Sequence, residues 1–132
     1  MFRILLAEDN PGDVLLFREA LRARNIEADL VVAEDGHKAI TLLDGKSGDR
    51  SPDLIVLDVN LPKRSGDEVL AWIRKEESLT RIPVVMLTSS ASPADRDKAT
   101  SLGASLYIQK SSNLRELFEV GAIIEGLLKP SA

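Results

Sequence analysis

Five side chains that are able to bind a metal ion and transfer a phosphoryl group stand at the ends of short apolar runs. They are Glu8 and Asp9 after "FRILLA", Asp58 after "LIVL", Thr88 after "VVML" and Lys110 after "LYIQ". If these runs are parallel strands of one sheet, their carboxyl ends meet at one edge, which is where such sheets bind ligands. The sequence therefore predicts one site with three carboxylates, a hydroxyl and an ammonium group.

The three carboxylates predict a site for a hard divalent cation. Carboxylates within a few ångström repel one another, and some must protonate unless a cation lies between them. Mg²⁺ typically takes one or two carboxylates and completes its octahedron with waters and phosphate oxygens. We therefore expect Mg²⁺, or Mn²⁺ in its place, at Glu8, Asp9 and Asp58.

The aspartate after the third run has the chemistry of a phosphoryl acceptor. Carboxylates form aspartyl-phosphate intermediates by nucleophilic attack, and the transfer needs the equatorial oxygens of the phosphoryl group to be neutralised. With Asp58 as the nucleophile, the cation would neutralise one oxygen and Lys110 another. The Thr88 hydroxyl and nearby backbone N–H groups would bind the third.

Each of these residues, taken alone, also has a simpler explanation. An acid after a strand often caps the next helix, which accounts for Asp9 as well as a ligand role does, and Thr88 is a good strand residue. Lys110 alone indicates still less. Asp58 resists this explanation, because the next helix is expected to begin only near Ser65. The joint occurrence of complementary groups favours a site.

Five strand patterns alternate with five helical patterns along the chain. The expected strands are 2–7, 30–33, 53–57, 83–88 and 105–108, and the expected helices are 11–24, 36–44, 66–76, 93–102 and 113–128. Several of the runs are apolar on both faces, as in strands that are covered on two sides. The pattern predicts an α/β fold, a doubly wound parallel sheet with helices on both faces.

Four of the expected helices begin with a small polar residue and carry an acid three positions later, which is the signature of a capping box. The pairs are Asn10 with Asp13, Ser65 with Glu68, Ser92 with Asp95, and Asn113 with Glu116. Asp13 is thus explained as a capping residue, and we assign no functional role to it.

Composition limits the class of protein. The chain has 132 residues, 44% of them hydrophobic, which fits one domain with an ordinary core. A net charge of -4 with scattered basic residues argues against binding to nucleic acid or to an anionic membrane. There is no cysteine and no apolar run near the ~20 residues of a membrane span. We expect a soluble cytoplasmic protein.

Over residues 1–128 the sequence resembles the receiver domain of two-component response regulators, with 129–132 as a C-terminal tail. The matching motifs are "EDN", "PDLIVLDVNLPKRSG", "IPVVMLTSS" and "GASLYIQK". Asp58, Thr88 and Lys110 follow the family's order and usual separations, 30 and 22 residues. The resemblance implies the flavodoxin-like (βα)5 receiver fold with five strands in the order 2-1-3-4-5.

The resemblance also implies a role for each site residue. Asp58 would be the phospho-acceptor, and Glu8 and Asp9 the acidic pair that binds the metal. Asp9 and Asp58 would be direct ligands, joined by the backbone carbonyl of Asn60. Lys110 would contact the phosphoryl group.

A switch pair is implied in the same way. The Thr88 hydroxyl would move toward the phosphoryl oxygens and the Tyr107 ring would turn inward behind it, biased by the added charge. One departure from the family is Ser111, because most members have proline in a cis peptide after the lysine. A cis bond before a non-proline residue costs ~2.5–4 kcal/mol, so we expect a trans or a strained peptide between Lys110 and Ser111.

The partners follow from a narrower resemblance. "EDNPGDVLLFREAL", together with "DVNLP", "LTSS" and a chain that ends with the domain, resembles the stand-alone regulators that pair with phytochrome-type histidine kinases. A histidine kinase, of the bacteriophytochrome type, is the expected partner.

The last expected helix carries two apolar stripes. The inward stripe is Leu114, Leu117, Phe118, Gly121, Ile124 and Leu128, and the second stripe is Val120, Ile123 and Leu127. The second stripe would face outward. Neighbouring chain could cover it in part, but we expect it to form a homodimer through helix 93–102, strand 105–108 and helix 113–128.

We expect a single-domain response regulator that catalyses only its own phosphorylation and dephosphorylation. A phosphatase with an aspartate nucleophile would want a second acid two residues after Asp58, where Asn60 stands. A flavin-binding carrier of similar fold would want a Ser/Thr/Gly-rich loop where Glu8 and Asp9 stand. A receiver that signals without phosphorylation is disfavoured, because the complete set of site residues is present.

Overall fold

The computed structural model describes residues 1–46, 48, 50–110 and 113–129, and for Leu114, Leu117 and Phe118 it describes the backbone alone. The strands are β1 (Phe2–Ala7), β2 (Ala28–Ala33), β3 (Leu54–Leu57), β4 (Val84–Thr88) and β5 (Leu106–Gln109). The helices are α1 (Pro11–Ala23), α2 (Gly36–Leu43), α3 (Gly66–Lys75), a short 3₁₀ helix η1 (Glu77–Leu79), α4 (Pro93–Ser101) and α5 (Leu114–Leu128).

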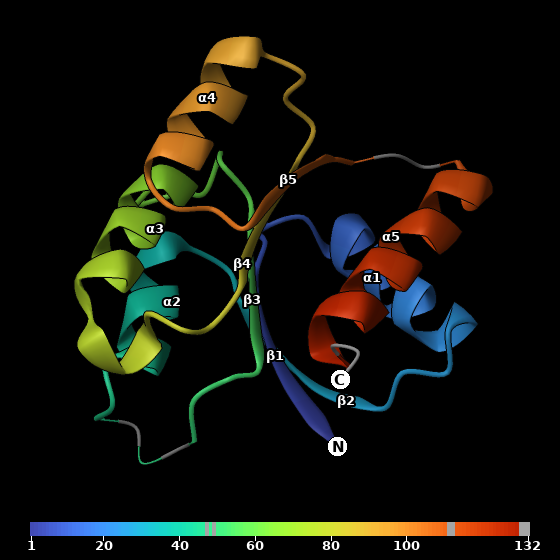
Figure 1. Ribbon diagram of the computed structural model, residues 1–132, viewed down its shortest axis with the longest axis horizontal. Helices are drawn as coiled ribbons and strands as arrows, with labels where there is room; N and C mark the ends of the chain where they lie inside the picture. Colours follow the sequence, from blue (N-terminus) through green and yellow to red (C-terminus); the bar gives the residue numbers. More distant parts are fainter. Residues whose placement is uncertain (47, 49, 111–112, 130–132) are drawn as a thin grey trace.

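The strands form one parallel sheet in the order β2-β1-β3-β4-β5, which confirms the predicted fold. All strands run toward the top of Figure 1, where β1 leads into α1 and β4 leads into α4. In the register, Ala7 lies opposite Leu57 of β3, and Leu57 lies opposite Met86 of β4. The residues that follow Ala7 and Leu57 therefore leave the sheet side by side.

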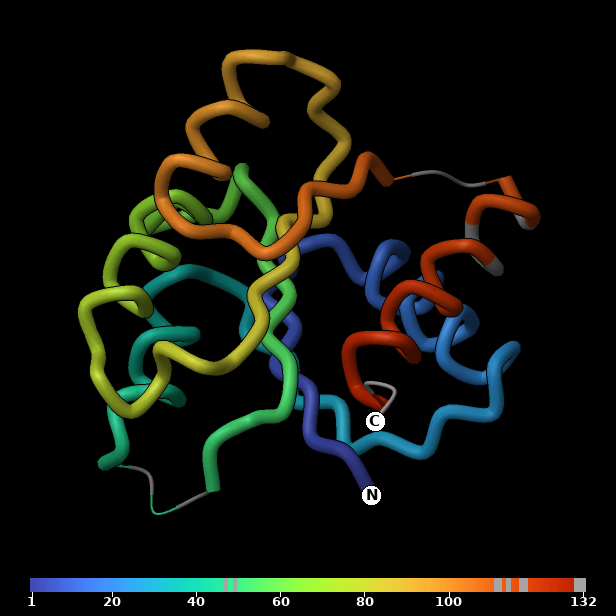
Figure 2. The backbone as a smooth tube through the Cα atoms, viewed as in Figure 1, coloured from blue at the N-terminus to red at the C-terminus, as the bar shows by residue number. Residues whose placement is uncertain are grey.

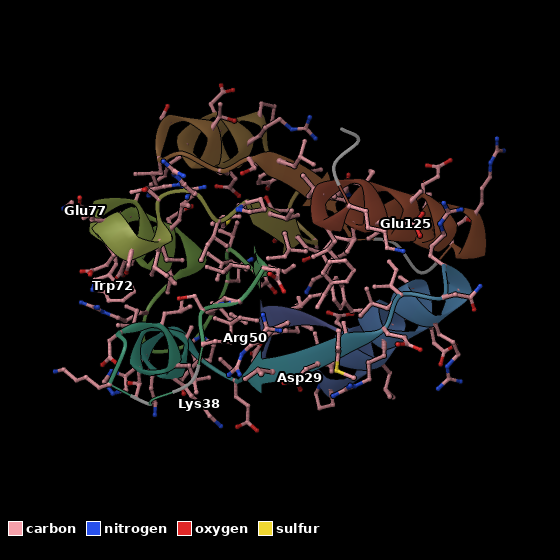
Figure 3. All side chains as sticks on the ribbon, turned by 60° about the horizontal axis from the view of Figure 1, so that its bottom comes forward. Asp29, Lys38, Arg50, Trp72, Glu77 and Glu125 are labelled. Atoms are coloured by element: carbon pink, nitrogen blue, oxygen red, sulfur yellow. The ribbon has the colours of Figure 1, made fainter. Side chains whose placement is uncertain are left out.

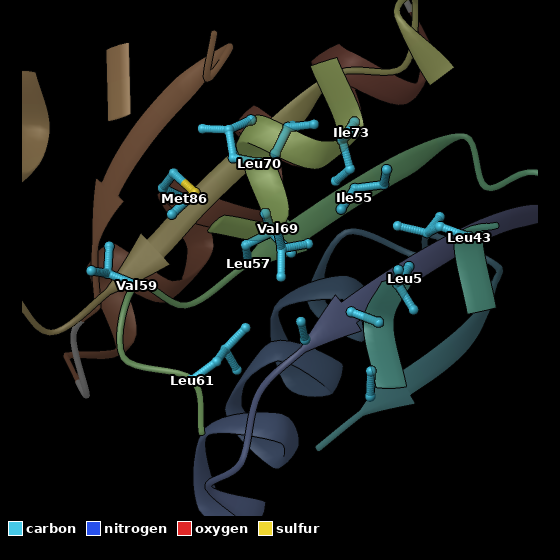
Figure 4. Close-up of a cluster of buried hydrophobic side chains, with 14 of the residues drawn as sticks. Leu5, Leu43, Ile55, Leu57, Val59, Leu61, Val69, Leu70, Ile73 and Met86 are labelled. Atoms are coloured by element: carbon cyan, nitrogen blue, oxygen red, sulfur yellow. The ribbon is translucent and has the colours of Figure 1, made fainter. Parts of the chain in front are cut away.

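Helices cover both faces of the sheet, so that two hydrophobic cores form. Helices α2, α3 and α4 lie on one face and α1 and α5 on the other (Figure 1). The strand β3 is fully buried between them, as its uninterrupted apolar sequence predicts. Figure 4 shows the core on the α2 and α3 side, where Val69, Leu70 and Ile73 of α3 pack on Ile55 and Leu57.

Helices α1 and α5 lie side by side (Figure 2). Gly121 lies where the two helices approach each other. A Cβ atom on this residue would lie 2.6 Å from the carbonyl oxygen of Ala20, so only glycine permits the approach. Gly121, Ile124 and Leu128 of the predicted inward stripe are buried. The side chains of its other members, Leu114, Leu117 and Phe118, lie outside the described part of the chain.

The second stripe of α5 faces outward only in part. Val120 and Leu127 are half-buried and pack against the core on the α1 side, whereas Ile123 is 39% exposed. Neighbouring chain therefore covers two of the three members in part, which is one of the two alternatives that the sequence left open. Both are reached by the core because they flank the inward-facing turns of the helix.

The helix starts follow the predicted capping residues. The side chains of Asn10, Ser65, Ser92 and Asn113 each accept hydrogen bonds from backbone N–H groups of the first turn. Asp35 caps α2 in the same way, which the sequence had not indicated.

The strand β2 begins two residues earlier than expected, and η1 was not expected. No described helix is both long enough and apolar enough to span a membrane.

Candidate functional site

Three carboxylates meet where β1 and β3 end. Glu8 and Asp58 directly follow the paired residues Ala7 and Leu57, and the Asp58 N–H donates to the carbonyl of Ala7 at 3.2 Å. Glu8 is 3% and Asp58 7% exposed, while Asp9 is exposed. One oxygen from each of the three lies within 4.8 Å of the others, the only such group in the described part of the chain.

The ammonium group of Lys110 lies on this acidic cluster. Its Nζ donates to Asp58 Oδ2 at 2.9 Å and to Asp13 Oδ2 at 2.8 Å, and it also pairs with Glu8 Oε1. The Lys110 side chain is 15% exposed. Its backbone N–H donates to the carbonyl of Thr88 at 2.7 Å, so the end of β5 is fixed to the end of β4.

The pKa values of Glu8 and Lys110 are both raised, which disfavours the charged form of Glu8 and favours the charged form of Lys110. Burial raises the pKa of Glu8, against the opposing effect of its hydrogen bond to Lys110. Burial alone would lower the pKa of Lys110, but its hydrogen bonds to Asp13, Glu8 and Asp58 raise that pKa above the ordinary value. Lys110 therefore stays an ammonium ion, whereas burial works against the charged form of Glu8.

The donor set fits a hard divalent ion. Its three carboxylates supply oxygen ligands, and a single ammonium is the cation that contacts them within the described residues. The Asn60 N–H donates to Asp58 Oδ1 at 3.1 Å, so that this loop turns back over Asp58. The Asn60 residue is exposed, next to the cluster in sequence and held beside it by that bond.

The loop after Asp58 is fixed against α3 by a glycine. A Cβ atom on Gly66 would lie 2.1 Å from the carbonyl oxygen of Asp58, and the Gly66 N–H donates to the Val59 carbonyl at 3.0 Å. The first residue of α3 therefore approaches the backbone of Asp58 as closely as only glycine allows. This contact holds the aspartate in place.

Ser90 joins the two residues of the expected switch pair. The Ser90 N–H donates to Thr88 Oγ1 at 3.3 Å, and the Ser90 carbonyl accepts from the Tyr107 hydroxyl at 3.0 Å. Its own hydroxyl donates to Asp95 Oδ2 of α4 at 2.5 Å. Thr88 is fully buried at the end of β4, and Tyr107 is half-buried. The structure thus links Thr88, the loop after it and α4.

The Tyr107 ring has a second neighbour on α4. The guanidinium carbon of Arg96 lies 5.3 Å from the ring centroid, within the range of a cation–π contact.

Trp72 lies on the flank of α3 near Glu77 and far from the α5 residue Glu125 (Figure 3). It packs partly against the core on the α3 side.

Two residues near the site were missed at the sequence level. Asp13 was explained by the helix cap alone, yet its carboxylate contacts Lys110. The signal was its position in the first turn of the helix that follows Glu8 and Asp9, which places it near the same sheet edge. The sequence gives no signal for Ser90, because its hydrogen bonds to Thr88 and Tyr107 are made by its backbone N–H and carbonyl. The expected peptide geometry at Ser111 lies outside the described residues.

The fold and the site define a class of protein. A doubly wound parallel sheet with acids at the ends of its first and third strands, and a lysine after its fifth strand, is the arrangement of a signalling receiver module. The chain belongs to the response regulator receiver domain family, whose sequence profile matches residues 4–121.

Similar proteins are known from cyanobacteria. The response regulator Rcp1 of a Synechocystis strain is 40% identical over 125 residues, which cover 92% of this chain and 85% of Rcp1. A crystal structure of the Mn²⁺-bound form of Rcp1 superposes with a TM-score of 0.88 at 38% identity, over 100% of this chain and 98% of that one. The phosphorylated cyanobacterial phytochrome response regulator RcpA has a TM-score of 0.88 at 40% identity, over 99% of this chain and 96% of that one.

Proposed function

We propose that this protein accepts a phosphoryl group on Asp58 from the phosphohistidine of a histidine kinase, in a reaction that depends on Mg²⁺. The observation that carries the proposal is the buried Asp58 carboxylate, which lies within 4.8 Å of two further acids and 2.9 Å from the Lys110 ammonium. A nucleophile, a metal-binding group and a fixed cation thus stand together. These are the parts that phosphoryl transfer requires.

Each residue has a defined task in this reaction. An oxygen of Asp58 attacks the phosphorus, the bond from phosphorus to the donor nitrogen breaks, and the imidazole leaves. Glu8, Asp9, Asp58 and the backbone carbonyl of Asn60 would hold the metal ion, which when bound neutralises charge on the phosphoryl oxygens. Mn²⁺ would serve in place of Mg²⁺, as supported by the Mn²⁺-bound form of Rcp1.

The other oxygens of the phosphoryl group would be bound by the chain itself. The Lys110 ammonium donates to one, and the Thr88 hydroxyl donates to another after it turns away from the Ser90 N–H. Because the Ser90 carbonyl accepts from the Tyr107 hydroxyl, a shift of this loop also moves the ring. Phosphorylation would thus change the surface of α4 and β5 that partners contact.

The likeness to a phytochrome response regulator supports the kinase class. RcpA is a phytochrome regulator solved in its phosphorylated form, and the two chains cover each other almost completely. We infer that the partner is a histidine kinase of the bacteriophytochrome type, and that the protein works in the cytoplasm without binding nucleic acid or membrane. The functional unit would be the receiver domain 1–128, with 129–132 as a tail.

Intact mass measurement tests the phosphoryl acceptor. We expect incubation with Mg²⁺ and a small-molecule phosphodonor to add one phosphoryl group to the wild type and none to Asp58→Asn. Removal of Mg²⁺ with a chelator should abolish the adduct. A wild type that gains no phosphoryl group would refute the acceptor role and leave a receiver that signals without phosphorylation.

We further propose that the protein forms a homodimer through α4, β5 and α5. Leu106 of β5 and Ile123 of α5 are each 39% exposed, and a groove of about 400 Å³ lies between these two elements. Sedimentation of the wild type should show a dimer that Ile123→Asp converts to a monomer. Leu15→Asp, at an exposed apolar residue of α1, is the matched control. A monomeric wild type, with and without a phosphoryl mimic, would refute the dimer.

A further inference from the structure

We propose that Asp13 is a positioning residue that holds the Lys110 ammonium beside Asp58 when a metal ion and a phosphoryl group engage the other acids. The inference rests on the proposed acceptor role of Asp58 and adds a residue to it. Its starting point is the 2.8 Å hydrogen bond from Lys110 Nζ to Asp13 Oδ2, the shorter of the two measured for this group with aspartates.

Asp13 differs from the other two partners of Lys110 because it stands outside the metal cluster. An ammonium group has three N–H donors, and here they meet Glu8, Asp13 and Asp58. In the described part of the chain, the oxygens that gather within 4.8 Å belong to Glu8, Asp9 and Asp58. A divalent ion would therefore compete with Lys110 for two of its three carboxylates and leave the third untouched.

Phosphorylation weakens the contact of Lys110 with Asp58 in addition. The Asp58 oxygen that attacks phosphorus becomes part of an acyl phosphate, and the carboxylate charge passes to the phosphoryl oxygens. Lys110 must then exchange a carboxylate for a phosphoryl oxygen. A lysine side chain is a flexible stem with a point charge, so it needs a fixed anion to stay in place during this exchange. Asp13 is the acid that is left for this task.

The local structure makes Asp13 a rigid anchor. It is the third residue of α1, and its N–H donates to the side chain of the Asn10 cap, so its backbone is fixed by the helix start. The helix is held in turn by Phe17, which is buried against the sheet. A cavity of about 40 Å³ beside Lys110 and Asp13 is lined mostly by apolar side chains such as Leu87. An apolar wall leaves the carboxylates to direct the ammonium.

A helix cap alone would explain an acid at this position, and the chain offers a control for that. Glu68 is likewise the third residue of its helix, α3, and follows the Ser65 cap. Its side chain is 59% exposed and pairs only loosely with Arg64, at 3.7 Å. Glu68→Gln therefore removes the same charge from a helix start without touching Lys110.

The first test is a double-mutant cycle on the rate of Asp58 phosphorylation by a small-molecule phosphodonor with Mg²⁺. We expect Asp13→Asn to lower the rate constant about tenfold, the size of one lost charge-assisted hydrogen bond. In a Lys110→Ala background the same change should alter the rate less than about twofold. Asp13→Glu should restore part of the rate, and Glu68→Gln should leave it unchanged.

The second test reads the position of Lys110 without using the reaction. Reductive methylation with peptide mass analysis reports how exposed each lysine is, with the exposed Lys98 as internal reference. With Mg²⁺ and beryllofluoride as the phosphoryl mimic, we expect Lys110 to be protected in the wild type and in Glu68→Gln. In Asp13→Asn its labelling should be several-fold faster.

The outcomes separate this inference from the acceptor role. If Asp13→Asn slows phosphorylation equally with and without Lys110, the acid acts on the metal or on the fold, and the inference is wrong. Unchanged labelling of Lys110 in Asp13→Asn would contradict it as well. A wild type that forms an Asp58 adduct, combined with an unaffected Asp13→Asn, overturns this inference alone. A wild type without any adduct overturns the acceptor role and the inference with it.

Discussion

The edge formed by β1 and β3 and the helix α4 are built from different kinds of contact. At the edge, the charged groups of Glu8, Asp58 and Lys110 are 3%, 7% and 15% exposed, and they pair directly. On α4, Ala99 is the single buried residue of the helix. Its other attachments are polar or lie at the surface, through Ser90, Tyr107 and Asp67.

From this difference we expect the acidic edge to be more rigid than α4. Buried charges are tolerated only where each is paired, so the acidic edge is held in one arrangement before any ligand arrives. A helix with few buried apolar contacts opens at a lower free energy than the core does. We therefore expect that binding of a metal ion or a phosphoryl group at the acidic edge shifts α4 without unfolding the sheet. The following predictions test this contrast.

The largest effect is expected from the removal of the buried cation. Lys110→Met leaves Glu8 and Asp58 without their partner, and we expect a loss of about 3 kcal/mol in the free energy of unfolding, measured with denaturant in a chelator. Lys98→Met breaks a 3.6 Å pair between a lysine whose side chain is 64% exposed and Asp67, whose side chain is 12% exposed, and should cost less, about 1 kcal/mol.

Addition of Mg²⁺ should reduce the difference between Lys110→Met and Lys98→Met in the free energy of unfolding. The metal occupies the acids that Lys110→Met has left uncompensated, and a ligand that binds only the folded state stabilises it. If both variants lost the same free energy of unfolding in the chelator, the charge pairs of the acidic edge would stabilise the protein no more than the surface pair of α4.

Most of the fold could be predicted because its signals are local and repeated. The apolar runs and the polar caps at Asn10, Ser65, Ser92 and Asn113 fixed the elements, and the alternation of strand and helix fixed the parallel sheet. The start of β2 was misplaced because its second residue, Asp29, interrupts the apolar run. The helix η1 has no capping side chain and so gave no start signal.

The site could be predicted where a charge stands at a strand end, and not where a contact depends on three-dimensional direction. The grouping of Glu8, Asp9 and Asp58 followed from the sheet edge alone. The Asp13 contact with Lys110 was missed because two residues 97 positions apart meet only after α1 and β5 are placed. The functional roles of these residues stay predictions until they are tested.

Glu8 is the acid of this edge for which burial works against the charged form. Burial raises its pKa above the ordinary 4.5, so the folded protein binds this proton more tightly than the unfolded chain. The contribution of Glu8 to stability therefore falls as pH rises through the window from 4.5 to the raised value. Glu8→Gln imitates the protonated form and should stabilise the metal-free protein by about 1–2 kcal/mol at neutral pH.

The pH dependence separates this effect from a general change of charge. The advantage of Glu8→Gln should shrink as pH falls through that window and vanish below 4.5. Denaturant unfolding in a chelator at several pH values measures it. Glu19→Gln, at an exposed residue of α1, should show no such trend. An advantage that stays constant with pH would contradict the burial of a charged Glu8.

A smaller effect is expected on the α4 side from Tyr107→Phe. The change removes the hydrogen bond from the Tyr107 hydroxyl to the Ser90 carbonyl, worth about 1 kcal/mol. Because this bond ties β5 to the loop before α4, amide hydrogen exchange in α4 should become about fivefold faster. Exchange in β1 and β3 should stay unchanged. Equal acceleration in the strands would show that α4 opens only with the whole domain.

The smallest expected effect comes from Arg96→Ala. The guanidinium lies 5.3 Å from the Tyr107 ring at the surface, where a cation–π contact contributes about 0.5 kcal/mol. Exchange in α4 should therefore quicken about twofold, and alanine's slightly better helix propensity makes this a lower bound. In a Tyr107→Leu background, which lacks the ring, Arg96→Ala should have no accelerating effect. If both backgrounds respond alike, the ring contact does not hold the helix, and other contacts, such as that of Tyr107 with the Ser90 loop, attach α4 to β5.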